Sequence, residues 1–300
     1  MSTIRLGTRR SRLAVAQAEL AADALRRIGA GDEVEIVALE TRGDEISRRR
    51  PSGTWVASDG QFTSDLEQQL VTGEVDAVVH SYKDLPTESD GRLVVAAVLE
   101  RGDPADCLIT ANDRGLEGLS FGARVGTSSA RRAAQLAALR PDVVAMPIRG
   151  NVESRIARVL RGELEAVLLA AAGLERLAIR VPSGSRLSLG DVLPAPAQGA
   201  LAIQVRRDQD AVVRAVGRAD HGPTRVAVEA ERALLRAVGG GCLAPLGALA
   251  EVDAGELRIR AAFEAHDGQL RRADERGSAN DPGALVARVA ARLLAVPVPA

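Results

Sequence analysis

Strand-like and helix-like segments alternate along the first two thirds of the chain, and this alternation restricts the folds that the sequence can adopt. Short aliphatic runs are typical of strands at residues 3–7, 33–39, 76–79 and 93–99. Between them, apolar residues recur at helical spacing over residues 11–28 and 64–72. Strands separated by helices of about 10–15 residues indicate βαβ units and a parallel sheet.

The same order of segments begins again near residue 105, where Cys107 reads as a buried strand residue. Further strands are expected at residues 124–126, 143–146 and 166–170, and helices at residues 129–139 and 151–160. A later strand-like run, residues 201–205, is expected to rejoin the first sheet. The pattern therefore predicts two similar α/β domains.

The pattern changes near residue 222. A helical segment at residues 223–238 leads into a glycine-rich turn, and alternating segments then follow at residues 247–253, 256–264 and 269–276, before a last helix at 282–294. Strands that are grouped together and flanked by helices indicate a small α+β domain. We therefore expect three domains, made of residues 1–100 with 198–218, residues 101–197, and residues 219–300.

One long stretch, residues 42–62, has no clear helix or strand pattern and contains several glycines and a run of three arginines. Loops of more than about 12–15 residues without secondary structure are uncommon and are often lids. This segment is interpreted either as a lid over a cleft between domains or as a tolerated insertion.

The charge balance excludes several classes of protein. The chain has 39 basic and 40 acidic residues, a net charge of −1, whereas general binders of nucleic acids or anionic membranes carry a basic excess. Aromatic residues make up only 2%, which disfavours a base-stacking surface. We expect no membrane span and no signal peptide. Two cysteines form neither a metal cluster nor a disulfide framework, so a cytoplasmic location is expected.

Two segments combine a strand end, hydroxyl residues and arginines at the start of a helix. They are GTRRS at residues 7–11 and VGTSSARR at residues 125–132. A helix N-terminus attracts anions, and an arginine just inside it can bind a carboxylate through two hydrogen bonds. The alternative is ordinary N-capping by Ser11 and by Ser128 or Ser129. Two copies in similar positions favour a shared anion site.

The charge near the second copy supports an anion site. Eight arginines and only two acids lie between Arg124 and Arg161, a local charge of +6 in a chain that is nearly neutral. The alternative is a scatter of solvated arginines on helices. A small polyanion accounts for the pattern better than a nucleic acid does.

A buried strand ends in polar residues in the segment DAVVHSYKD, residues 76–84. The carboxyl edge of a parallel sheet is the usual place for a binding site. Asp84 is a candidate general acid and base. Lys83, the only lysine of the chain, is a candidate partner for an anion. The alternative is a strand-end turn with a surface lysine.

Three glycines precede Cys242 in the segment GGGCLAP, residues 239–245. Small neighbours leave room for a large group at the sulfur, and a thiolate can attack an electrophilic carbon. No histidine lies nearby in the sequence, so a Cys/His hydrolase is not indicated. The alternative is a glycine-rich turn with an incidental cysteine.

Seven segments in order resemble the porphobilinogen deaminase family over almost the whole chain. They are GTRRSRLA (7–14), DAVVHSYKDLP (76–86), VGTSSARRAAQL (125–136), RGNVESR (149–155), AAAGLERL (170–177), LPAPAQGAL (193–201) and ERALLRAVGGGCLAPLGALA (231–250). The resemblance implies a three-domain monomer with two α/β domains similar to periplasmic-binding-protein lobes and a small C-terminal α+β domain. It also implies a dipyrromethane cofactor attached covalently through a thioether to Cys242, and no metal.

The resemblance implies a cytoplasmic transferase of tetrapyrrole, and hence heme, biosynthesis. Its substrate would be porphobilinogen, of which four molecules are deaminated, joined and released as a linear tetrapyrrole. Asp84 would be the catalytic residue. Cofactor contacts would come from Cys242, Asp84, Ser11, Ser81, Lys83, Thr127, Ser129, Arg131 and Arg132. Substrate contacts would come from Arg9, Arg149, Arg155 and Arg176.

The sequence departs from the family pattern in the expected lid. Asp59 and Ser64 stand where lysines are common, which leaves Arg48, Arg49 and Arg50 as candidate substitutes. Ser154 replaces a threonine but keeps the hydroxyl. Two rival functions are a two-lobed protein that binds a polycarboxylate without chemistry and an arginine-rich nucleic-acid binder. The absence of an export signal and the segment around Cys242 disfavour the first, and the net charge disfavours the second.

Overall fold

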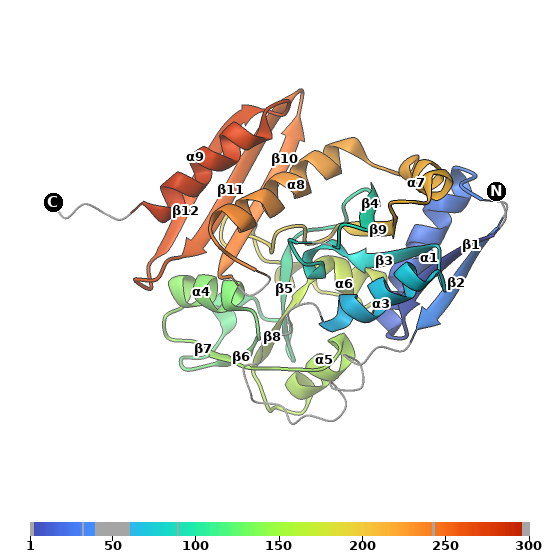
Figure 1. The fold of residues 1–300 in the computed structure, drawn as a ribbon. Helices are drawn as coiled ribbons and strands as arrows, with labels where there is room; N and C mark the ends of the chain where they lie inside the picture. The colour runs from blue at the N-terminus through green and yellow to red at the C-terminus, as the bar shows by residue number, and fades with distance from the viewer. Residues whose placement is uncertain (1–2, 32, 40–60, 89, 242–243, 296–300) are drawn as a thin grey trace.

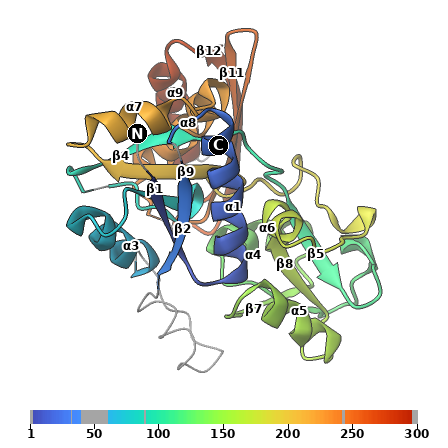
Figure 2. The ribbon, with the colours of Figure 1, turned by 90° about the vertical axis from the view of Figure 1, so that its right-hand side faces the viewer.

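The structure is a computed structural model that describes residues 3–31, 33–39, 61–88, 90–241 and 244–295. These residues form three sheets of five, four and three strands, with helices packed against each (Figures 1 and 2). The expected α/β class, with a small C-terminal α+β part, is confirmed. Most of residues 42–62, including the arginine run, lie outside the described residues.

The first sheet has the strand order β2-β1-β3-β9-β4. Its strands are β1 (Ile4–Arg9), β2 (Val34–Leu39), β3 (Ala77–Ser81), β4 (Leu93–Val98) and β9 (Leu201–Arg206). Helices α1 (Arg12–Arg27) and α7 (Asp210–Gly217) share one apolar cluster with it, and α3 (Gln61–Thr72) shares another. The run at 201–205 therefore rejoins the first sheet, as expected.

The expected parallel pairing is found for β1 with β2 and β3, but the sheet is mixed, because β9 runs antiparallel to β3 and β4. In this register Leu201 lies opposite Ser81, so the chain returns to the sheet beside the end of β3. The reversal follows from that point of entry. It also brings residues 197–200 next to the polar end of β3.

The second sheet has the order β5-β8-β6-β7. Its strands are β5 (Asp106–Thr110), β6 (Arg124–Gly126), β7 (Val144–Met146) and β8 (Ala166–Ala170), and its helices are α4 (Ala130–Leu139), α5 (Val152–Leu160) and α6 (Ala171–Arg176). β6 is parallel to β7 and β8, whereas β5 is antiparallel to β8, a second departure from a purely parallel sheet. The restart near residue 105 thus corresponds to a second sheet.

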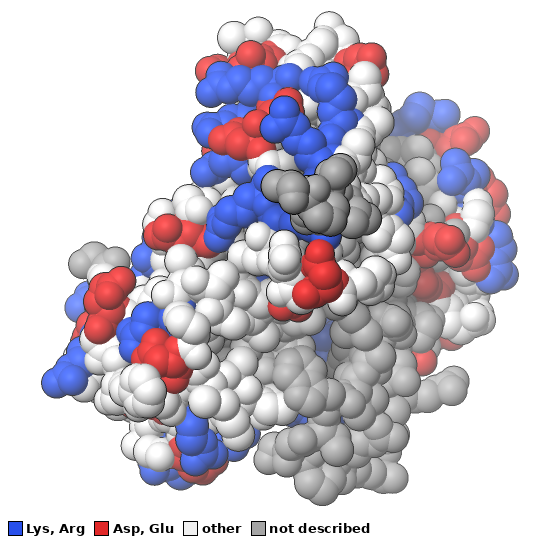
Figure 3. All heavy atoms as spheres, turned by 90° about the vertical axis from the view of Figure 1, so that its left-hand side faces the viewer, with Lys and Arg blue, Asp and Glu red and all other residues white. Residues whose placement is uncertain are grey.

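The third sheet is an antiparallel meander of β10 (Leu246–Asp253), β11 (Glu256–Glu264) and β12 (Leu270–Ser278). Helices α8 (Gly222–Ala237) and α9 (Pro282–Leu294) bury their apolar faces on it. Ion pairs join its strands at Arg258–Asp274 and Arg260–Glu251. Basic and acidic side chains are interleaved on the face of the molecule that Figure 3 shows.

Two connections link the first and second sheets, one between β4 and β5 and one that leads into β9. They lie against each other, since Gly102 N donates to Gly199 O at 3.2 Å. Gly199 has a φ of +90°, and a Cβ there would be 2.5 Å from Gly102 O. Only glycine fits this close approach of two backbones.

Helix α8 is tied to both connections by one buried carboxylate, Glu231. Its oxygens accept from Arg101 Nη1 at 2.6 Å and from the backbone N atoms of Ala197 at 2.6 Å and Ala250 at 2.7 Å. Arg101 Nε also donates to Gln198 O at 2.8 Å. Because Glu231 has no solvent exposure, its charge depends on these donors.

We predict that Glu231→Gln destabilises the fold by about 3–5 kcal/mol, since it leaves the mostly buried Arg101 without its anion. The free energy of unfolding in urea measures the effect. The control is Glu256→Gln, which breaks an ion pair with Arg276 whose side chains are 50% and 60% exposed and should cost less than about 1 kcal/mol. Equal effects of the two changes would contradict the role of Glu231.

Candidate active site

The polar ends of β1 and β3 lie at the same edge of the first sheet, because the two strands are parallel neighbours. β1 leads to Ser11, which caps α1 by accepting from Ala14 N at 3.2 Å. β3 ends at Ser81, whose Oγ accepts from Gln17 Nε2 of α1 at 2.9 Å. The strand–helix segment around Ser11 and the strand end around Ser81 are therefore brought together.

A single 3-10 turn, η1 (Tyr82–Asp84), follows β3 and carries the candidate catalytic residue. Asp84 is exposed and Lys83 is half-buried. Lys83 Nζ donates to Gln198 Oε1 at 3.2 Å. Burial lowers the pKa of Lys83 to about 8; the charges of Asp84 and Asp106 oppose the shift, and those of Arg132 and Arg131 add to it.

Arg232 of α8 holds the backbone on both sides of Asp84. Its guanidinium lies 4.5 Å from the ring centroid of Tyr82 and donates to the carbonyl oxygens of Leu85 at 2.8 Å and Pro86 at 2.6 Å. Burial and the neighbouring Glu229 carboxylate, which accepts from the hydroxyl, raise the pKa of Tyr82. The turn that carries Asp84 is thus anchored to the C-terminal helix.

Asp106, at the start of β5, is fully buried and binds both arginines of the second strand–helix segment. Its oxygens accept from Arg131 Nη1 at 2.7 Å and from Arg132 Nη2 at 2.6 Å. Despite the opposing effect of burial, the two guanidinium charges hold the pKa of Asp106 far below its usual range. The same burial lowers the pKa of Arg131. Both arginines thus lie at one carboxylate.

The hydroxyl residues near α4 have separate partners. Ser129 caps the helix, accepting from Arg132 N at 3.4 Å, and Thr127 Oγ1 accepts from Ser129 N at 3.1 Å. Ser128 Oγ instead donates to the carbonyl oxygen of Ile148 at 2.6 Å. N-capping is therefore confirmed for Ser11, and of Ser128 and Ser129 it is Ser129 that caps α4. A capping serine still has its own O–H to donate to a ligand.

Arg155 of α5 is influenced by the charges of Asp84 and Arg132, which also act on Lys83. Burial lowers its pKa to about 10, the charge of Arg132 adds to the shift, and the charge of Asp84 opposes it. Within the described residues only its Nε donates a hydrogen bond, to Gly150 O at 2.8 Å. The charges of Asp84 and Arg132 therefore act on both Lys83 and Arg155, although these residues belong to segments that follow strands of two different sheets.

The other expected residues are more dispersed. Arg176, at the end of α6, donates to Gly199 O at 2.5 Å, and burial lowers its pKa. Arg9 and Arg149 are half-buried. Cys242 lies outside the described residues; α8 and the turn that begins at Gly239, with a φ of +72°, lead to it.

Sequence reasoning missed three residues of this site: Asp106, Gln198 and Arg232. Asp106 stood beside Cys107 in a short strand and gave no periodic signal. Gln198 and Arg232 lay inside segments quoted for the family resemblance, but no role was expected for either. The contacts Gln198–Lys83, Gln198–Asp106 and Arg232–Leu85 each join residues more than 90 positions apart in the chain, which a local pattern does not report.

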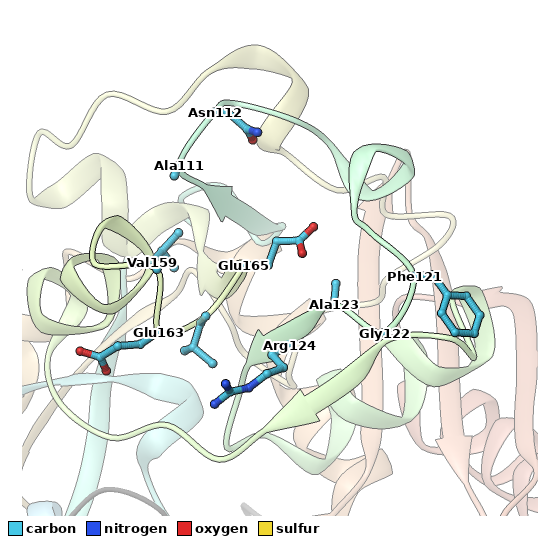
Figure 4. Close-up of a pocket in the computed structure, with 11 residues that line it drawn as sticks. Ala111, Asn112, Phe121, Gly122, Ala123, Arg124, Val159, Glu163 and Glu165 are labelled. Atoms are coloured by element: carbon cyan, nitrogen blue, oxygen red, sulfur yellow. The ribbon is translucent and has the colours of Figure 1, made fainter.

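A separate pocket lies on the second sheet (Figure 4). It is lined by residues of the β5–β6 and α5–β8 connections, among them Phe121, Glu163 and Glu165, and by Arg124 of β6 and Val159 of α5. None of the expected site residues lines it. It is therefore distinct from the candidate active site. Among the described residues, no helix is long and apolar enough to cross a membrane.

Comparisons with known proteins agree with the resemblance. Residues 4–214 match the family model "Porphobilinogen deaminase, dipyromethane cofactor binding domain", and residues 226–295 match "Porphobilinogen deaminase, C-terminal domain". The porphobilinogen deaminase of Xanthomonas axonopodis pv. citri is 45% identical over 97% of this chain and 95% of its own length. That of Stenotrophomonas maltophilia is 43% identical over 98% and 97%.

Among solved structures, a putative methionine-binding lipoprotein of Bacillus subtilis is similar with a TM-score of 0.44 and 15% identity, over 74% of this chain and 91% of that one. YhfZ of Shigella flexneri is similar with a TM-score of 0.40 and 15% identity, over 77% and 89%.

Beneath the site, His80 of β3 is buried and bonds to a buried amide. Its Nε2 lies 3.0 Å from Gln204 Oε1, and Gln204 Nε2 donates to Glu67 Oε1 at 3.0 Å. Burial lowers the pKa of His80 to about 4, against the effect of its hydrogen bond to Gln204. The folded protein therefore keeps this imidazole neutral at pH values where the unfolded chain protonates it.

We predict a pH dependence of stability from His80. Between its folded pKa and the ordinary value of about 6.5, the unfolded state binds more protons, so stability falls as the pH falls. His80→Gln should reduce the loss of unfolding free energy between pH 7 and pH 5 by about 2 kcal/mol relative to the unchanged protein. Urea unfolding at both pH values measures this. The same change at the exposed His266 should have no such effect, and an equal loss in all three proteins would refute the prediction.

Proposed function

The chain belongs to the porphobilinogen deaminase family, and on that premise we propose which of its residues carry the family's reaction. The protein is a transferase with hydroxymethylbilane synthase activity. It deaminates porphobilinogen, joins four of the resulting units on a dipyrromethane cofactor, and releases the linear tetrapyrrole hydroxymethylbilane and ammonia. The rival functions, a binding protein without chemistry and a nucleic-acid binder, are not supported by these relatives.

The donors around Asp84 fit a polycarboxylate cofactor. Each pyrrole unit made from porphobilinogen carries an acetate and a propionate. Within the described part of the chain, Lys83 Nζ donates one hydrogen bond, and only the Nε of Arg155 donates. Burial lowers the pKa of both groups, so each charge is destabilised by its surroundings, and an arriving carboxylate would stabilise it. The Nε atoms of Arg131 and Arg132 are buried without a partner among the described residues.

When bound through a thioether to Cys242, dipyrromethane supplies the free α-carbon of a pyrrole as the nucleophile. Asp84 is proposed as the acid and base of the reaction. Its carboxyl group donates a proton to the amine that leaves porphobilinogen, and as a carboxylate it stabilises positive charge at the pyrrole nitrogen of the substrate. The anchoring of η1 by Arg232 supports this role, because a catalytic group works best from a fixed position.

The remaining residues are proposed as partners of carboxylates. Cofactor contacts are assigned to Ser11, Ser81, Lys83, Thr127, Ser129, Arg131 and Arg132, and substrate contacts to Arg9, Arg149, Arg155 and Arg176. The cap serines support this, since each keeps an O–H to donate. For Arg131 and Arg132 the ion pair with Asp106 limits the donors left over, so we assign them to orientation as well as binding.

We also base our proposals for the domain boundaries, the cellular location and the binding partners on the family membership. We propose that the sheets correspond to domains 1–100 with 198–218, 101–197, and 219–300. We propose a cytoplasmic monomer that binds neither nucleic acid nor membranes. The mixture of basic and acidic side chains over the described residues of the face in Figure 3 supports the proposal that nucleic acid is not a partner. The expected role of Arg48, Arg49 and Arg50 lies outside the described residues.

We predict that the purified protein has an intact mass above that of its sequence by two pyrrole units. Mass spectrometry of the denatured protein measures this, since a thioether survives denaturation. Cys242→Ser should remove the added mass, whereas the control Cys107→Ser should keep it, because Cys107 is a buried strand residue whose thiol pKa burial raises. Active protein with an unmodified mass would disprove the covalent attachment.

We predict that Asp84→Asn lowers kcat by about 10²–10⁴-fold, the usual contribution of a positioned general acid–base group. Because Asp84 is exposed, the unfolding free energy should change by less than about 0.5 kcal/mol. Production of hydroxymethylbilane and urea unfolding measure the two effects. The control is Glu88→Gln, an exposed carboxylate four residues further on. A kcat of the Asp84 variant equal to that of the control would refute the assignment.

A further inference from the structure

A buried amide, Gln198, lies between the residues of the first sheet and those of the second. Its side chain is in the connection that leads into β9, and the residue is 1% exposed. The amide Nε2 donates to Asp106 Oδ1 at 2.8 Å and to Pro104 O at 2.8 Å. The amide Oε1 accepts from Lys83 Nζ at 3.2 Å. One neutral group thus separates an ammonium from a buried carboxylate.

The two charges fix the orientation of this amide. Turned by 180°, it would present its NH₂ to the ammonium of Lys83 and its oxygen to the carboxylate of Asp106, and both contacts would be repulsive. The backbone holds the residue in place as well, since Gln198 N donates to Ala195 O at 2.9 Å and Gln198 O accepts from Arg101 Nε at 2.8 Å. Gln198 is therefore rigid and has one stable orientation.

The charges around Lys83 explain why a neutral amide, that of Gln198, is its hydrogen-bond acceptor. Asp84 and Asp106 favour its charged form, and Arg131 and Arg132 disfavour it. The carboxylate of Asp106 already forms ion pairs with both arginines, which compensate its negative charge. An ammonium that moved to Asp106 would weaken those ion pairs and leave the vicinity of Asp84. The amide gives Lys83 a neutral acceptor in place of that carboxylate.

We propose that Gln198 is a positioning residue for the reaction: it holds Lys83 beside Asp84 and keeps it from pairing with Asp106. The inference rests on the proposed function for the role of Lys83 as a partner of carboxylates. The bridge itself is independent of that role. Lys83 keeps N–H donors for a ligand, because among the described residues its ammonium donates one hydrogen bond, to the uncharged amide oxygen of Gln198.

Two substitutions change the bridge in opposite directions. Gln198→Glu has nearly the same shape and adds a negative charge within hydrogen-bond distance of the ammonium, so it should raise the pKa of Lys83 by at least about one unit; it also removes the Nε2 donation to Asp106. Gln198→Met removes the acceptor and keeps the volume, so it should lower that pKa, since burial then acts with less compensation. The matched control is Gln204→Met, because Gln204 is also a fully buried amide but binds His80 and Glu67 instead.

The single lysine makes the measurement direct. Protein grown with lysine labelled with ¹⁵N at Nζ and ¹³C at Cε gives one side-chain signal, which belongs to Lys83 without assignment. NMR titration of the complete, cofactor-loaded protein should give an increased midpoint for Gln198→Glu, a decreased one for Gln198→Met, and an unchanged one for Gln204→Met. The alkaline limb of the pH profile of kcat/KM should move with the midpoint.

Equal midpoints in the unchanged protein and both Gln198 variants would overturn the proposal, as would an equal shift in Gln204→Met. If Gln198→Met does not fold, the near-isosteric Gln198→Glu decides alone. Failure of this proposal is distinct from failure of the proposed function, because the titration does not depend on turnover. If the Lys83 midpoint shifts in the Gln198 variants but the alkaline limb of the pH profile of kcat/KM does not, the role of Gln198 in the reaction is also overturned. Gln198 would then position Lys83, but Lys83 would not take part in the reaction.

Discussion

The positions of several site residues depend on the ion pairs and the hydrogen bond that the buried carboxylate of Asp106 accepts. A buried carboxylate is stable only when charged or dipolar donors surround it, and here Arg131, Arg132 and Gln198 supply them. The two arginines come from the first turn of α4, and the glutamine comes from the connection between the sheets. One charge therefore fixes the start of a helix, the course of a connection and, through the amide, the position of the only lysine.

Helix α8 supplies a second set of anchors from the third sheet. Its neighbouring residues Glu231 and Arg232 act on different parts of the molecule: the carboxylate binds the connections between the sheets, and the guanidinium binds the turn that carries Asp84. The same helix leads to the glycine turn before Cys242. The helix that anchors the turn of the proposed catalytic residue therefore also precedes the proposed cofactor attachment in the chain.

The sequence predicted most strands and helices, because apolar periodicity and N-cap residues such as Ser129 are local signals. It missed helices α6 and α7, which have six and eight residues and too few turns for a clear pattern. It did not give the antiparallel direction of β9 and β5, since strand direction depends on where the chain re-enters a sheet. It named Arg131 and Arg132 as site residues, but their partner Asp106 is set by tertiary packing. Lys83 was noticeable in the sequence because it is the only lysine, whereas nothing in the composition pointed to its partner Gln198.

The central claim is that one constellation, with Asp84 at its centre, receives the carboxylates and pyrrole nitrogens of a cofactor held on Cys242. A crystal structure of the cofactor-loaded protein tests it most directly. The account predicts a bond from Cys242 Sγ to dipyrromethane, pyrrole nitrogens within hydrogen-bond distance of the Asp84 carboxylate, and carboxylates at Lys83 and Arg155, with Asp106 still paired to both arginines. A cofactor whose pyrrole nitrogens lie away from Asp84, or whose carboxylates displace Asp106 from its arginines, would contradict it.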